Sequence, residues 1–180
     1  MNRTFFLAMR GAITALLMLA PIAALSASDF GEPAPDFARR VLAMHNQERM
    51  RLGLAPLSWN MRLSQEAQQW ANILVRCGAF EHSQVQDTGE NLWMGTAGFY
   101  SPEQMVGDFL SERRAFHPGR FPNVSTSGNW SDVGHYTQVI WPQTQDVGCA
   151  IARGRGEDVM VCRYWPAGNV DGESVGLVQN

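Results

Sequence analysis

Two strand-like runs that meet at a tight turn restrict the possible folds of this chain more than any other feature. Residues 147–153 and 158–165 contain many Val, Cys, Tyr and other strand-forming side chains, and the segment GRGED lies between them. A two-residue loop within GRGED pairs residues whose numbers add up to 311, and Cys149 and Cys162 meet this condition. Residues that face each other in an antiparallel ladder lie about 4.5–5.5 Å apart at Cα, which suits a disulfide. The pattern therefore predicts a hairpin with a Cys149–Cys162 bond, although a longer loop would shift this register.

The cysteine content is typical of an oxidising compartment. The chain has three cysteines, so a Cys149–Cys162 disulfide leaves Cys77 as a single thiol. Cys77 lies near the end of a predicted amphipathic helix. We therefore expect it to be a small buried apolar side chain rather than a reactive thiol.

The first residues have the order of a secretory signal peptide. Two arginines flank a polar start, residues 11–25 are mostly apolar, and small side chains follow. The apolar run is short for a membrane span, and Pro21 interrupts it. We predict a signal peptide over residues 1–27 and a mature chain that is soluble, without a membrane span.

The remainder of the chain has the size of one domain. Cleavage near Ala27 leaves 153 residues, enough to form a single hydrophobic core. We expect a Pro-rich lead at 28–35, one domain at 36–175 and a short tail at 176–180.

Charge excludes two classes of function. Without the signal peptide the chain has 12 Arg against 17 Asp and Glu, a net charge of −5, which argues against nucleic acid as a partner. The chain contains no Lys, so Schiff-base chemistry on a lysine is excluded.

Hydrophobic periodicity predicts helices early in the chain and strands near its end. Asn60 is a suitable helix cap, Gly78 a helix stop, and Ser101 with Gln104 a capping box. The expected helices cover residues 36–52, 60 or 61–77 and 101–116, the expected strands 136–141, 147–153 and 158–165, and a Pro- and Gly-rich loop 117–133. This order favours an α+β fold with helices packed on an antiparallel sheet.

Two polar side chains fall in apolar positions. Glu112 shares a helix face with Met105, Phe109 and Phe116, where an ionised carboxylate needs a partner or a cation. Strand alternation would place His135 on one side with valine and tryptophan in the segment GHYTQVIW. Each has a simpler explanation: the carboxylate reaches water at the edge of the stripe, or a backbone carbonyl binds the imidazole.

Four motifs together resemble one known family. They are HNQER at 45–49, GENL at 89–92, GHYTQVIWPQT at 134–144 and VMVCRYWPAGNV at 159–170. In this order they are similar to the CAP superfamily of cysteine-rich secretory proteins, antigen five and plant pathogenesis-related proteins, also called SCP domains. The resemblance covers residues 37–173 and implies a three-layer α-β-α sandwich with a central, mainly antiparallel sheet.

The resemblance also implies a cleft lined by two histidines and two glutamates. The matching positions are His82 and Glu90, in a segment that we expect to be a polar loop, with Glu112 and His135. Imidazole and carboxylate groups suit zinc, so the resemblance implies a divalent-cation site at His82 and His135, with Glu90 and Glu112 as further candidate ligands. The alternative is that the four side chains satisfy one another by hydrogen bonds without metal. Motif residues with expected structural roles are His45, Asn46, Arg49, Asn91 and Gln138.

Two classes of function follow from the resemblance. The first is a secreted binding module, released to the medium or retained in a periplasm, for small apolar ligands such as sterols or fatty acids, or for another extracellular macromolecule. Candidate groove walls are Phe99, Tyr100, Phe121, Trp130 and Trp165. The second is a secreted protease or esterase in which His82 or His135 is the base and Ser83 or a metal-bound water the nucleophile. The absence of HExxH and GxSxG motifs favours the binding module.

Overall fold

The computed structural model describes residues 35–176, and its central element is a four-stranded sheet. The strands are β1 (Ser58–Trp59), β4 (Asp146–Gly154), β5 (Glu157–Trp165) and β2 (Gly89–Thr96), in that spatial order. β1 runs parallel to β4, and the other neighbours are antiparallel. The sheet is therefore mainly antiparallel, as predicted.

The hairpin that joins β4 to β5 has the predicted register. Arg155 and Gly156 both have positive φ angles, 56° and 85°, as a two-residue type I′ turn requires. Cys149 lies opposite Cys162, and a disulfide joins them. Because the turn has no spare residue, the pairing follows directly from the sequence.

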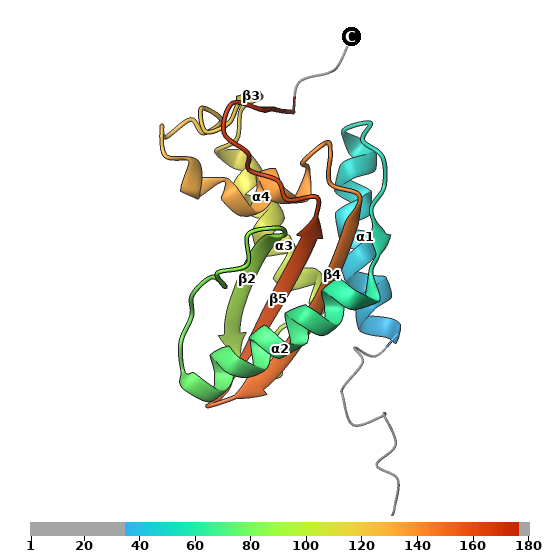
Figure 1. Ribbon diagram of the computed structural model, residues 1–180, viewed down its shortest axis with the longest axis vertical. Helices are drawn as coiled ribbons and strands as arrows, with labels where there is room; N and C mark the ends of the chain where they lie inside the picture. Colours follow the sequence, from blue (N-terminus) through green and yellow to red (C-terminus); the bar gives the residue numbers. More distant parts are fainter. Residues whose placement is uncertain (1–34, 177–180) are drawn as a thin grey trace, which may run out of the picture. The chain divides into compact units, whose positions relative to one another are not determined.

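Helices cover both faces of the sheet and complete three layers (Figure 1). α2 (Met61–Cys77) lies on one face, while α1 (Pro35–Arg51), α3 (Pro102–Ser111) and α4 (Gly134–Val139) lie on the other. The residues of β5 alternate between two cores: Val159 and Val161 pack with α2, whereas Met160 and Tyr164 pack with the other helices. The α+β sandwich is therefore confirmed.

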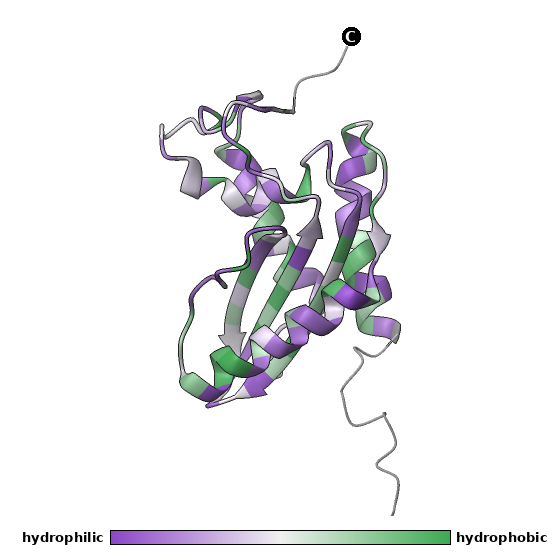
Figure 2. Cartoon of the chain, in the orientation of Figure 1, coloured by the Kyte–Doolittle hydropathy of each residue, from purple (hydrophilic) through white to green (hydrophobic). Residues whose placement is uncertain are grey.

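The layer formed by α2 packs very closely on the sheet. Its inward side chains include Ala67 and Ala71, which meet Ala150 on β4. A Cβ atom added at Gly148 would lie 2.3 Å from the backbone nitrogen of Ser64, so only glycine fits there. The middle of α2 shows mainly hydrophilic residues on its outer side, while apolar residues cover long stretches of β4 and β5 (Figure 2).

Local signals placed the helix ends correctly. The Asn60 side chain accepts hydrogen bonds at the start of α2, and Gly78 ends the helix in the left-handed region with φ 68°. Ser101 and Gln104 form the predicted capping box of α3. α3 nevertheless ends at Ser111, earlier than predicted, and a 3-10 turn over Glu112–Arg114 follows.

The predicted strand at 136–141 is wrong, because residues 134–139 form the helix α4. Almost every residue from Tyr136 to Trp141 is buried, so the alternation of polar and apolar side chains did not mark an inner and an outer face. A short buried run of this kind has no periodicity that distinguishes a strand from a helix. His135 therefore lies in the first turn of a helix.

The polar loop expected around His82 and Glu90 is correct for His82 but wrong for Glu90, which belongs to β2 (Gly89–Thr96). The strand has glycines at Gly89 and Gly95 and few β-branched residues, so its sequence gives little local indication of a strand. Pairing with β5 along its whole length supplies the missing stabilisation. The loop predicted at 117–133 contains β3 (Gly119–Arg120), which pairs with β6 (Ser174–Val175).

Cys77 is exposed, which corrects the expectation of a buried side chain. It is the last residue of α2, three positions after Leu74, the last buried residue of the helix. The predicted signal peptide lies outside the described residues, as do most of the Pro-rich lead and of the tail. Between residues 35 and 176 the structure has no helix with the length and apolar character that crossing a membrane requires.

Candidate functional site

His82 and Glu90 form the first histidine–glutamate pair. The Nδ1 atom of His82 lies 3.0 Å from Oε1 of Glu90. The Glu90 side chain is 7% exposed and the His82 side chain 61% exposed. The carboxylate is thus part of the protein interior, while the imidazole is open to solvent.

Further donors hold the Glu90 carboxylate. Ser83 donates from its backbone nitrogen at 2.9 Å and from its hydroxyl at 2.8 Å, and the Arg163 guanidinium lies 3.3 Å away. Burial raises the pKa of Glu90, but the hydrogen bonds from His82 and Ser83 and the charge of Arg163 outweigh it, so the net pKa lies below its ordinary value. Glu90 is consequently a carboxylate at neutral pH.

His135 and Glu112 form the second pair, on the other side of the sheet. Nδ1 of His135 lies 2.5 Å from Oε1 of Glu112, and the second oxygen of Glu112 accepts a 3.0 Å hydrogen bond from the Tyr136 backbone. That backbone N–H belongs to the first turn of α4, where donors lack partners within the helix. The Phe109 ring stacks on the imidazole with centroids 5.0 Å apart. Glu112 thus both caps α4 and orients His135.

Strand β2 connects the two pairs. Glu90 lies on the α2 side of the strand, as Leu92 does, and Asn91 on the opposite side. The Asn91 side chain donates to the backbone carbonyl of His135 at 3.1 Å. The four predicted residues therefore form two separate pairs, one on each side of the start of β2.

Both imidazoles use Nδ1 for the glutamate contact. This leaves Nε2 of His82 and of His135 without a hydrogen-bond partner in the described chain. Metal-binding histidines commonly donate one ring N–H to a carboxylate and bind the ion with the other nitrogen. Each free Nε2 atom is therefore a suitable donor for a divalent cation. No group of three or more His, Cys, Asp or Glu side chains between residues 35 and 176 is arranged to hold a metal, so the cation site stays a prediction.

A buried hydrogen-bond chain links α1 to the second pair. His45 contacts the Val41 carbonyl through Nδ1 at 2.9 Å and the Tyr164 hydroxyl through Nε2 at 2.8 Å. Asn91 donates to the same hydroxyl at 3.2 Å. Burial lowers the pKa of His45 to about 4, so the ring is neutral at physiological pH.

Arg49 is a buried cation whose partners are backbone carbonyls. It donates to the carbonyls of Ala55, Val139, Trp141 and Thr144 at 2.8–3.1 Å. Burial lowers its pKa to about 10, so it remains charged at neutral pH. These contacts attach α1 to the end of α4 and to the segment after it.

Asn46 and Gln138 each bind backbone across a gap in sequence. Asn46 exchanges two hydrogen bonds with the backbone of Leu57, at 2.7 and 3.0 Å. The Gln138 side chain accepts from the Gly168 backbone at 2.9 Å and donates to the Thr144 hydroxyl. These side chains hold loops in place and are turned to the interior.

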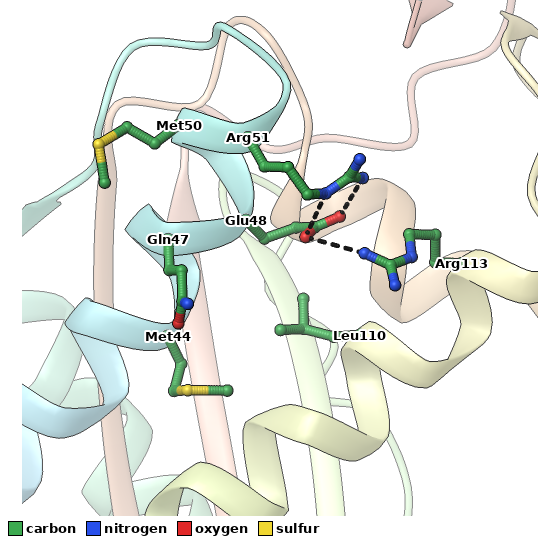
Figure 3. Close-up of a pocket in the computed structure, with 7 residues that line it drawn as sticks. All are labelled: Met44, Gln47, Glu48, Met50, Arg51, Leu110 and Arg113. Carbon is green, nitrogen blue, oxygen red and sulfur yellow. Dashed lines mark hydrogen bonds and ion pairs between the residues drawn. The ribbon is translucent and has the colours of Figure 1, made fainter.

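The sequence did not predict an open pocket of about 520 Å³ between α1 and α3 (Figure 3). Met44 and Leu110 supply apolar walls, and Glu48 lies at the polar side. Arg51 binds Glu48 through two hydrogen bonds of 3.0 and 2.7 Å, and Arg113 donates to it at 3.3 Å. Glu48 shares the apolar face of α1 with Met44, a signal of the same kind as the one that singled out Glu112.

The aromatic residues predicted as groove walls do not form one surface. Phe121 is 4% exposed and packs against the rings of Trp130 and Trp141, so it belongs to the core. Phe99 and Tyr100 are exposed and pack against each other. The prediction of Phe121 as a wall is therefore wrong.

Comparison with known proteins agrees with the fold and the motifs. The model of the cysteine-rich secretory protein family, CAP, matches residues 42–164. The chain belongs to this family. A pathogenesis-related protein PR-1 of Medicago truncatula is 34% identical over 139 residues, which cover 76% of this chain and 78% of that protein. Venom allergen 5 of Polybia scutellaris rioplatensis is 33% identical over 130 residues, covering 66% of this chain and 60% of the allergen.

Solved structures show the same CAP architecture. The crystal structure of NaASP2 with Zn2+ superposes with a TM-score of 0.67 at 24% identity, over 80% of this chain and 88% of that one. The structure of BmVAL-1 gives the same TM-score and identity, over 80% of this chain and 83% of that one. At this level of identity the likeness establishes the fold alone.

Proposed function

We propose that this CAP protein is a secreted binding module for a small apolar ligand with an acidic head group. The observation that carries the proposal is the pocket between α1 and α3, where an apolar wall adjoins two arginines. Arg51 and Arg113 share a single carboxylate, Glu48, so the cluster has one positive charge in excess. A second carboxylate would balance this charge, and Met44 and Leu110 would contact an alkyl chain.

This arrangement favours a fatty acid over a sterol, because a sterol has no anionic group for the arginines. Hydrogen bonds from Arg51 hold the pKa of Glu48 below its ordinary value despite burial, so Glu48 is ionised. An ionised Glu48 repels a ligand carboxylate and cannot share a proton with it. The ligand head group must therefore bind the outer N–H groups of the guanidinium ions. The side chain of Arg113 is 53% exposed and can reach it.

Arg113→Gln is expected to weaken binding of a long-chain fatty acid about tenfold, the equivalent of one charge-assisted hydrogen bond. Binding can be measured by displacement of a fluorescent fatty acid from the mature protein. The matched control is Arg114→Gln, since Arg114 is exposed and, among residues 35–176, its side chain hydrogen-bonds to the Ser111 carbonyl alone. A fatty-acid methyl ester should bind both variants equally. Equal weakening by the control, or loss of ester binding in Arg113→Gln alone, would contradict the proposed head-group contact.

We further propose that His82 and His135 bind a divalent cation through Nε2. The supporting observation is the orientation of both rings by glutamates. In addition, the similar protein NaASP2 has a crystal structure with Zn2+. Bound zinc would act as a Lewis acid. Glu90 and Glu112 would keep the ring orientation and raise the basicity of the ligating nitrogens.

His82→Ala and His135→Ala are each expected to lower zinc affinity at least tenfold, because each removes one of the two proposed ligands. Glu112→Gln should lower the affinity about 10–100-fold by loosening His135. Native mass spectrometry with added zinc, with and without a chelator, reports occupancy. His117→Ala is the control, since His117 is exposed and contacts the Pro118 carbonyl. Zinc retained in both alanine variants would reject the assignment.

A secreted hydrolase that uses the same residues has less support. The Ser83 hydroxyl donates to Glu90 and accepts from Arg163, and no imidazole contacts it. A serine nucleophile needs a base within hydrogen-bond reach of its hydroxyl. Peptide and ester cleavage that disappears in Glu112→Gln with the fold intact would favour catalysis instead.

Secretion is part of the proposal. It is supported by the order of charged, apolar and small residues at the N-terminus and by the family of secretory proteins to which the chain belongs. Another extracellular macromolecule remains an alternative partner. Fractionation of the producing cells, with the medium and any periplasm assayed separately, tests whether the protein is secreted.

A further inference from the structure

The outer edge of β2 is long and regular, and within residues 35–176 no second strand pairs with it. β2 is the last strand of the sheet and pairs only with β5 within the described chain (Figure 1). Its register is continuous from Gly89 opposite Tyr164 to Thr96 opposite Glu157, so no bulge interrupts it. The opposite edge is the two-residue strand β1. Proteins usually shorten, bend or cover an edge strand. In this sheet the edge strand β1 is short, whereas the edge strand β2 has eight residues in continuous register.

The hairpin register shows which backbone groups of β2 face outward. Cys149 and Cys162 are 4.0 Å apart at Cα, as in a pair without mutual backbone hydrogen bonds. Cys162 therefore directs its N–H and C=O to β2, where it faces Asn91. Alternation then turns the N–H and C=O groups of Glu90, Leu92 and Met94 away from β5. No hydrogen bond to these groups comes from the rest of the described chain.

The segments beside this edge are acidic. Residues 78–112 contain six Asp and Glu and no Arg or Lys. Glu90, Glu103 and Glu112 are paired with Arg163, Arg40 and His135, which leaves the carboxylates of Glu81, Asp87 and Asp108. Glu81 and Asp87 are exposed on the loop, which hydrogen bonds from residues 82 and 83 to Glu90 hold near the start of β2. Asp108 is exposed on α3 and accepts from the indole of Trp93 on the other face of β2. Carboxylates thus flank the edge on both sides of the sheet.

We propose that β2 binds a basic, extended peptide segment of a partner protein as a fifth strand of the sheet. The outward N–H and C=O groups supply main-chain hydrogen bonds, and the carboxylates of Glu81, Asp87 and Asp108 attract Lys or Arg side chains on the incoming strand. A second copy of this chain fits less well, because its β2 would bring the same negative charges against the first. The proposal is independent of the fatty-acid and cation sites.

Met94 offers a test that separates backbone from side-chain contacts. Its N–H points outward and its side chain is 40% exposed. Met94→Pro removes this donor without breaking a hydrogen bond to β5, because proline is tolerated on edge strands where the N–H faces solvent. Met94→Ala keeps the donor and removes the side chain. Glu81→Gln/Asp87→Asn removes charge from the exposed loop and leaves β2 unchanged.

The probe is a synthetic twelve-residue peptide of alternating Lys and Thr, titrated into the mature protein by calorimetry, with amide chemical shifts recorded in parallel. Control peptides replace Lys by Glu or carry an N-methyl group at every residue, because methylation of alternate residues would leave one backbone edge free to pair. We expect the basic peptide to bind at least tenfold more tightly than either control and to shift the amides of Glu90, Leu92 and Met94. Met94→Pro and the Glu81→Gln/Asp87→Asn variant should each bind it at least tenfold more weakly, and Met94→Ala should bind it normally.

Several results would overturn the proposal. Equal binding of the N-methylated peptide would show a purely electrostatic contact, and an absence of binding would remove the proposal altogether. A dimer of this chain that dissociates in Met94→Pro would identify a second copy as the occupant. If Met94→Pro fails to fold, the N-methylated peptide and the charge variant still decide the outcome on the wild-type backbone.

Discussion

Arg49→Ala is expected to lower the free energy of unfolding by about 3–5 kcal/mol, the largest effect of any single substitution considered for this chain. The side chain is fully buried and donates to four backbone carbonyls. Its removal leaves these buried acceptors without their donor, and each buried unsatisfied group costs about 1–3 kcal/mol. Partial relaxation of the loops keeps the total below the sum of the individual costs.

Urea unfolding of the oxidised protein, followed by tryptophan fluorescence, measures this loss. Arg39→Ala is the matched control, since Arg39 is exposed and, within the described part of the chain, its one ion pair is with Asp36 in the adjacent turn. It should change the free energy of unfolding by less than about 1 kcal/mol. Arg49→Lys should recover only part of the loss, because an ammonium group cannot reach four separated carbonyls. Similar midpoints for Arg49→Ala and Arg39→Ala would refute the structural role of Arg49.

The stability of the protein is expected to fall by about 3 kcal/mol as the pH drops from about 6.5 to about 4, through His45 alone. Burial lowers the folded-state pKa of His45 to about 4, whereas an unfolded chain has the ordinary value of about 6.5. In this range the unfolded chain binds a proton that the folded chain does not. The free energy of unfolding therefore rises with pH through this window and gains nothing more from His45 above it.

The comparison of two histidine variants isolates this effect. His45→Gln keeps an acceptor for the Tyr164 hydroxyl but has no titrating group. Between pH 4.5 and 6.5 the slope of its unfolding free energy against pH should be smaller by the equivalent of about one bound proton. His117→Gln, at an exposed position, should keep the slope of the parent protein. Unfolding in urea at half-unit pH steps gives the slopes directly. An unchanged slope in His45→Gln would mean that His45 is already protonated in the folded state.

Local sequence signals specified the parts of the fold that depend on near neighbours. The two-residue turn at Arg155 and Gly156 sets the register that brings Cys149 to Cys162. The Asn60 cap likewise sets the start of α2. In each case a few consecutive residues determine the backbone angles, so no knowledge of distant contacts is needed.

The elements that were predicted wrongly depend on distant partners. β2 is a strand because β5 pairs with it, and its own residues from Gly89 to Thr96 indicate little. α4 begins where Glu112, more than twenty positions earlier in the chain, accepts the N–H of Tyr136. Periodicity over a short window cannot detect an interaction of this range.

The candidate site shows the same division. The family resemblance located His82, Glu90, Glu112 and His135, but not the division into two pairs or the use of Nδ1 in both. The pocket between α1 and α3 was missed, since it needs the distance between two helices that no local pattern gives. Glu48, a charged residue on an apolar helix face, was the one sequence signal that pointed to it.

The two faces of the sheet differ in how they can change over evolutionary time. On the α2 side, alanines and Gly148 let the backbones of the helix and the strands pack close together, so a larger side chain would clash. On the opposite side, methionine and large aromatic rings fill the layer, and such side chains can adopt other rotamers around a new guest. Descendants of this chain should therefore acquire new specificity through α1, α3 and α4 while α2 stays almost constant.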